Sequence, residues 1–198
     1  QDGVEILLKK TPRLSDNPDA PREGVRILLD AGHGGEDNGA SGCAGTDGPL
    51  EKDLNLALTL AAKARLEQLG AWVSLTRSDD SYLSLAQRLE MVNSQAPDFF
   101  ISLHHNSIAL TRDTLDVNGT ECYWFTPQSE DLAAALTSRF AAAFGCNDRG
   151  AREDYYFVTR TTACPAVLLE SGFVTTALEY ERCTDEAGLW AEGGAVAE

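Results

Sequence analysis

The chain has 198 residues, an apolar fraction of 43% and a formal net charge of −15. This length fits one domain with a substantial core. The charge argues against nucleic acid as a partner, because binding it requires clustered Lys and Arg that displace counterions. No apolar run approaches the roughly 20 residues of a membrane span, so we predict none. The working expectation is a soluble, monomeric domain with an acidic surface.

The first 23 residues differ in composition from the rest of the chain. Val4 to Lys9 predicts a short strand, and Thr11 to Glu23, which is rich in Pro, Asp, Asn and Ser, predicts a linker. The first residues contain neither the basic nor the apolar stretch of a signal peptide. We therefore interpret residues 1–23 as a strand and linker from an upstream segment and residues 24–198 as the functional domain.

Apolar runs of strand length alternate with segments of helical periodicity from Val25 onward. The expected strands cover residues 25–30, 72–76, 99–103, 120–125, 155–159 and 166–170. The expected helices cover residues 54–69, 84–96, 131–144, a segment from about 176, and 190–198. Gly70 and Gly145 follow two of these helices in the usual terminating position. The pattern predicts a single α/β domain whose largely parallel, twisted sheet has helices on both faces.

The five cysteines do not form a recognisable functional motif. No pair has the CxxC spacing of a thiolate zinc site or a thioredoxin-like centre, which argues against a redox protein. We expect Cys122 and Cys164 to be small buried residues beside strands. Cys146 and Cys183 could form a disulfide, and the sequence leaves this open.

Three of the apolar runs end at, or just before, a residue that can bind a metal ion or take part in metal-assisted catalysis. Residues 27–33 end at His33, residues 99–104 end at His104, and residues 166–170 end at Glu170. In an open α/β sheet, ligands bind outside the carboxyl ends of the strands. These three side chains are therefore expected to converge.

A catalytic zinc usually has three protein ligands and one position for water or substrate. His33 and His104 supply two imidazoles, and Glu51 at a helix start supplies a carboxylate near the His33 turn. Asp30 or Asp37 could instead be a ligand, or could accept a hydrogen bond from His33. Glu170 then remains as a general base. The competing interpretation is structural: hydrogen-bonded histidines at strand ends and acids at a helix start or a strand edge.

Six segments of the chain resemble the zinc-dependent N-acetylmuramoyl-L-alanine amidases of the Amidase_3 type. They occur here in the same order as in that family. The resemblance covers the chain from about Val25 to its end. The segments are ILLDAGHGG (27–35), EKDLNLA (51–57), LTR (75–77), LAQR (85–88), FISLHHNS (100–107) and PAVLLESGF (165–173). Taken together these motifs are highly specific, whereas DAGHG alone is less so.

The resemblance implies a bacterial peptidoglycan hydrolase that cuts the amide between N-acetylmuramic acid and the L-alanine of the stem peptide. It implies that residues 24–198 are the catalytic domain and that it works outside the cytoplasm, in the cell wall or periplasm. It makes His33, Glu51 and His104 the ligands of one Zn²⁺ ion and Glu170 the catalytic acid/base. Asn106 and Arg149 match recurring residues near the substrate groove. His105 lies where the family varies and is left out of the ligand set, although its ring could donate to substrate.

The stretch after His104 is short compared with that of some relatives. Amidases that are controlled by cell-division activators have a long insertion here, whose helix plugs the site. Residues 106–119 are too few for a substantial plug, so we predict an open groove. Two other functions stay possible: a zinc amidohydrolase or carboxypeptidase that cuts another bond of the stem peptide, and a wall-binding module without activity.

Overall fold

The computed structural model describes residues 9–109 and 117–198. The expected strand at residues 4–9 falls almost entirely outside this part, and residues 11–23 form loop and turns. Six strands form one sheet in the order β2-β1-β3-β6-β4-β5. They are β1 (Arg26–Ala31), β2 (Trp72–Leu75), β3 (Phe99–Asn106), β4 (Thr120–Trp124), β5 (Asp148–Glu153) and β6 (Ala166–Phe173).

The sheet is mostly parallel, as predicted. Strands β2, β1, β3 and β6 run parallel to one another, whereas β4 runs antiparallel to β6 and parallel to β5. The central strands β1 and β3 are almost continuously buried, because both of their faces are covered by other elements. Their carboxyl ends lie at one edge of the molecule, where the candidate site is found.

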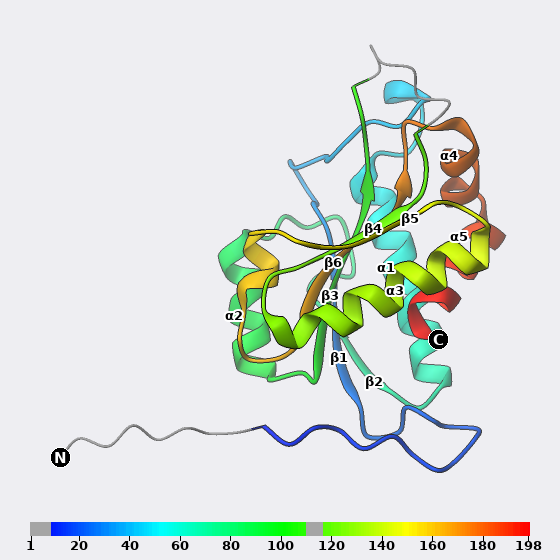
Figure 1. The fold of residues 1–198 in the computed structure, drawn as a ribbon. Coiled ribbons are helices and arrows are strands. Elements are labelled where there is room, and N and C mark those ends of the chain that lie inside the picture. The colour runs from blue at the N-terminus through cyan, green and yellow to red at the C-terminus, as the bar shows by residue number, and fades with distance from the viewer. Residues whose placement is uncertain (1–8, 110–116) are drawn as a thin grey trace.

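Helices cover both faces of the sheet (Figure 1). On one face lie α1 (Glu51–Gln68), α3 (Glu130–Phe144), α4 (Ala177–Thr184) and α5 (Glu186–Ala197). On the other lie α2 (Leu85–Gln95) and the short 3-10 helix η3 (Phe157–Arg160). Two further 3-10 turns are η1 (Gly45–Asp47) and η2 (Pro127–Ser129). No helix in the described part of the chain is long and apolar enough to cross a membrane.

Local sequence signals explain where the helices begin and end. Asp53 accepts a hydrogen bond from the backbone N–H of Leu50 at 3.0 Å, at the start of α1. Ser84 and Gln87 form the predicted capping box at the start of α2. Gly145 ends α3 in the left-handed conformation, with φ of 61°. These helices match the expected ones to within a few residues.

One expected strand is wrong and one real strand was missed. Residues 157–160 form a 3-10 helix rather than a strand, and Val158 packs into the core beneath α2. The apolar run at 155–159 therefore reflects a buried turn, because short apolar runs do not distinguish strand from turn. The missed strand, β5, has the polar sequence DRGARE and lies at the sheet edge, where no apolar face is required.

Candidate metal centre

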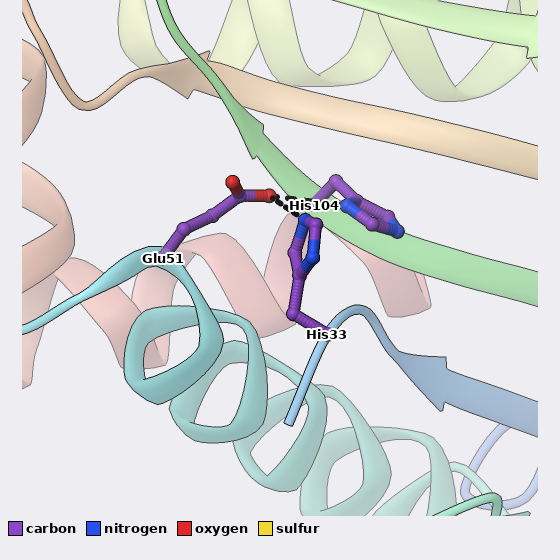
Figure 2. A group of neighbouring side chains, drawn as sticks. All are labelled: His33, Glu51 and His104. Atoms are coloured by element: carbon purple, nitrogen blue, oxygen red, sulfur yellow. Dashed lines mark hydrogen bonds and ion pairs between the residues drawn. The ribbon is translucent and has the colours of Figure 1, made fainter. Parts of the chain in front are cut away.

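Three side chains from three different elements meet at the carboxyl end of the sheet. His33 lies in the turn after β1, Glu51 is the first residue of α1, and His104 lies near the end of β3 (Figure 2). One potential ligand atom from each lies within 4.8 Å of the other two. His33 Nε2 is 3.0 Å, and His104 Nδ1 is 3.1 Å, from the same carboxylate oxygen of Glu51. The predicted trio is therefore close enough to bind a single ion.

The turn that holds His33 is tightly constrained. His33 has a φ of 61°, a left-handed conformation that is uncommon for a residue with a side chain and that occurs often at functional sites. A buried arginine from β2's end, Arg77, donates to the carbonyl oxygens of Ala31 and Gly32, at 3.0 and 2.8 Å. Arg88 from α2 donates to the carbonyl oxygen of His33 at 2.8 Å. The two arginines fix the backbone that presents the imidazole.

Two glycines allow the ligands to approach one another. A Cβ atom at Gly32 would lie 2.2 Å from the ring of His104. A Cβ atom at Gly39 would lie 2.6 Å from a carboxylate oxygen of Glu51 and 2.7 Å from the ring of His33. Backbone without side chains thus surrounds the cluster on two sides, which suits a compact ion site.

The surroundings of the three ligands favour a divalent cation. Nε2 of His33 faces Glu51, and Nδ1 of the same ring lies 2.9 Å from a carboxylate oxygen of Asp37. This is the orienting carboxylate typical of metal-bound histidine. Burial alone would lower the pKa of His33, but the hydrogen bonds and charges of Glu51 and Asp37 outweigh it and raise the pKa to about 9. Two imidazoles and one carboxylate are a donor set that suits a divalent metal ion.

The sequence left open whether Asp30 or Asp37 serves the site, and the structure separates their positions. Asp37 contacts His33, as described above. Asp30 is buried below the turn, where it accepts hydrogen bonds from Thr76 and Ser102 at 2.6 Å and pairs with Arg88. Asp30 therefore holds the scaffold, whereas Asp37 contacts the candidate ligand His33.

Glu170 lies on β6 directly beside His104, its register partner on β3. Both residues line a pocket of about 360 Å³ that also includes His33 and Glu51. The Oε2 atom of Glu170 is buried and has no hydrogen-bond partner among the described residues. Burial raises the pKa of this carboxyl well above its usual value, and the negative charges of Glu51 and Glu121 raise it further. A carboxyl held in this way suits proton transfer.

Residues 27–198 match the family described as N-acetylmuramoyl-L-alanine amidase, Amidase_3. The chain belongs to this family. It is 37% identical over 173 residues to the probable cell wall amidase LytH of Staphylococcus epidermidis, covering 87% of this chain and 55% of LytH. It is 35% identical over 166 residues to the N-acetylmuramoyl-L-alanine amidase LytC of Bacillus subtilis, covering 82% of this chain and 32% of LytC.

A solved structure supports the same assignment. The catalytic domain of CwlV, an N-acetylmuramoyl-L-alanine amidase from Bacillus (Paenibacillus) polymyxa var. colistinus, superposes with a TM-score of 0.78 at 37% identity. The match covers 86% of this chain and 93% of the CwlV domain. The chain is thus an Amidase_3 catalytic domain, a cell wall peptidoglycan hydrolase, although it spans only about half the length of LytH.

The two expected substrate residues of this amidase domain contact the same buried carboxylate, and of the two only Asn106 lines the pocket. Asn106 is in the pocket wall, at the end of β3. Arg149 is on β5, and its guanidinium lies 5.0 Å from the ring centroid of Phe173. Both side chains donate to Glu121, at 2.6 and 3.0 Å. The pocket lining also contains the aromatic residues Tyr82, Tyr156 and Phe157.

His105 points in the opposite direction to His104, as alternation along a strand requires. Its ring is buried; Nδ1 lies 2.8 Å from Asn55 Oδ1, and Nε2 lies 3.5 Å from Glu192. Asn55 in turn donates to Glu51 at 3.2 Å. The ring nitrogens therefore face buried partners, which supports leaving His105 out of the ligand set.

The predicted absence of a plug concerns residues 106–119, of which 110–116 lie outside the described residues. Among the residues that the structure does describe, the metal-binding cluster contains only His33, Glu51 and His104. The five cysteines are free, so no disulfide joins Cys146 and Cys183. Cys122 and Cys164 are buried, as expected.

Sequence reasoning missed Glu121 and Tyr156. Glu121 lies within an expected strand and was not singled out there. A charged residue at a buried strand position is nevertheless a signal that the residue has a paired or functional role. Tyr156 fell within the wrongly expected strand at 155–159, which concealed its position at the pocket.

Proposed function

We propose that this domain hydrolyses the amide between N-acetylmuramic acid and L-alanine with one zinc ion bound by His33, Glu51 and His104. The observation that carries the proposal is the convergence of these three ligand atoms within 4.8 Å in a member of the amidase family. Three protein ligands leave a fourth position for water or substrate, which is the arrangement of catalytic rather than structural zinc sites.

A zinc ion at this position would polarise the scissile carbonyl and lower the pKa of water to about 7. Glu170 accepts the proton of the attacking water, because it is the carboxyl that lines the same pocket and is not a ligand. It then returns that proton to the departing amine of L-alanine. The shielded environment of Glu170 favours this return, since burial, the largest cause of its raised pKa, stabilises its protonated form. Asp37 keeps the His33 ring oriented throughout.

Asn106 in the pocket lining and Arg149, which contacts the same Glu121 carboxylate, bind the stem peptide. An amide and a guanidinium are suited to peptide carbonyl and carboxylate groups. The substrate is cell wall peptidoglycan, so the domain works outside the cytoplasm of a bacterium, in the wall or periplasm. It needs no second copy for this chemistry, because all four metal and catalytic side chains come from one chain.

The test is to digest purified peptidoglycan and identify the new ends by mass spectrometry. We expect stem peptides with a free L-alanine amine and glycan with a free lactyl carboxylate. Glu170→Gln should reduce kcat by about 10²–10⁴-fold, the usual contribution of an acid/base residue, while the protein retains its zinc. Cleavage within the stem peptide would instead support a carboxypeptidase or another amidohydrolase. Near wild-type turnover by the Gln variant would disprove the role of Glu170.

A further inference from the structure

Glu121 is a buried carboxylate for which the catalytic mechanism gives no role. It is 3% exposed, and it is absent from the pocket lining. Burying a charge is costly unless the charge is paired and hydrogen-bonded. In this sheet a neutral, apolar residue at the same position of β4 would avoid that cost, so the carboxylate needs an explanation.

The sheet register fixes Glu121 relative to the metal centre. Glu121 is the partner of Glu170 across the β4–β6 pair, and Glu170 is the partner of His104 across the β6–β3 pair. Directly opposed residues in a sheet project to the same face. Glu121 on β4 therefore lies beside Glu170 on β6, and Glu170 lies beside His104 on β3.

The oxygen Oε1 of Glu121 fixes the orientation of the Asn106 amide. Nδ2 of Asn106 donates to it at 2.6 Å, while the backbone N–H of Ser107 donates to Asn106 Oδ1 at 2.7 Å. A carboxylate can only accept, so the amide cannot flip. The amide nitrogen carries two hydrogens, and the second remains for a carbonyl oxygen in the pocket that Asn106 lines. The Tyr123 hydroxyl also donates to Oε1, at 2.8 Å.

The oxygen Oε2 of Glu121 holds Arg149 by one nitrogen. The contact is made by Nε at 3.0 Å, and the guanidinium also lies over the ring of Phe173. Because Glu121 uses only Nε, the two terminal nitrogens of the guanidinium remain for another partner, and their spacing suits a carboxylate. Arg152 adds a second positive charge, with Nε 3.5 Å from the same oxygen. The two arginines place two positive charges against the single carboxylate of Glu121.

We propose that Glu121 is a positioning residue for the substrate, which holds Asn106 and Arg149 as paired donors for the carbonyl and carboxylate groups of the stem peptide. This rests on the proposed function, because it assumes that the stem peptide binds at Asn106 and Arg149. Glu121 itself does not touch the substrate. Its removal should weaken peptide binding and leave the hydrolytic step largely intact.

The experiment compares Glu121→Gln with wild type on two substrates, a muramoyl tetrapeptide with free carboxylates and muramoyl-L-alanine amide. Loss of a hydrogen bond to a charged group corresponds to roughly tenfold or more in binding. We expect KM for the tetrapeptide to rise about tenfold with kcat within about twofold, and KM for the short amide to change by less than about twofold. Glu153→Gln, the same substitution at an exposed position of β5, is the matched control and should match wild type.

Two results would overturn the inference. One is an unchanged KM for the tetrapeptide, and the other is an equal loss of kcat on both substrates, which would place Glu121 in the chemistry instead. If Glu121→Gln fails to fold, Arg149→Ala and Asn106→Ala decide the question, because each must give the same rise in KM for the tetrapeptide alone. A wild-type protein that releases no L-alanine amine would disprove the proposed function itself before any variant is compared.

Discussion

Gly32→Ala should destroy the metal centre without changing any ligand. The new Cβ would lie 2.2 Å from Cε1 and 2.3 Å from Nε2 of the His104 ring, whereas ordinary contacts are 3.4–4 Å. The ring must therefore move by about 1.2 Å, the difference between 3.4 and 2.2 Å. Metal–ligand distances tolerate only about ±0.2 Å, so the displaced imidazole can no longer complete the site. We expect loss of bound zinc and at least ~10²-fold lower activity, the usual effect of a 1 Å misplacement.

The assay is metal content by plasma mass spectrometry together with thermal unfolding and amidase activity. Gly194→Ala is the matched control, because this glycine lies within α5 and a Cβ there would have no neighbour within 4 Å. The control should keep its zinc and gain up to about 1 kcal/mol in stability from better helix propensity. A Gly32→Ala protein that binds zinc with wild-type affinity and cleaves normally would refute the described packing of His104 against the turn.

Further predictions concern the support of the site and of the fold. Asp37→Asn should weaken zinc binding by about 10–100-fold, measured by competition with a chelator, because the carboxylate that orients His33 is lost; unchanged affinity would contradict this role. Arg88→Met should lower the free energy of unfolding by about 3–5 kcal/mol in urea, because Asp30 is left buried without its charged partner; a loss below 1 kcal/mol would disagree. Chelation should abolish activity and added zinc should restore it, whereas chelator-resistant activity would exclude a metal mechanism.

The sequence predicted the parts of the fold in which local and global signals agree. Strands β1, β3 and β6 each contain an apolar run because both of their faces are covered. The capping box at Ser84 and the glycine at 145 mark helix ends without tertiary context. The convergence of His33 and His104 followed from the rule for strand ends. The position of Glu51 beside them required only that α1 begin close to the His33 turn.

The remaining features depend on packing that a linear pattern does not contain. β5 is polar because it is an edge strand, and the apolar residues of η3 are buried by α2 rather than by strand pairing. The role of Glu121 arises from register, which places it opposite Glu170 only because β4 runs antiparallel to β6. The choice between Asp30 and Asp37 likewise needed the path of the turn, since both acids are near His33 in sequence.

The central claim is that two imidazoles and one carboxylate bind a single zinc ion beside Glu170. The most direct test is an anomalous difference map recorded at the zinc absorption edge from crystals of the protein. We predict one peak about 2.0–2.2 Å from a nitrogen of His33, a nitrogen of His104 and an oxygen of Glu51, with no fourth protein ligand. The absence of a peak between these side chains, or a peak capped by a fourth protein side chain, would contradict the account.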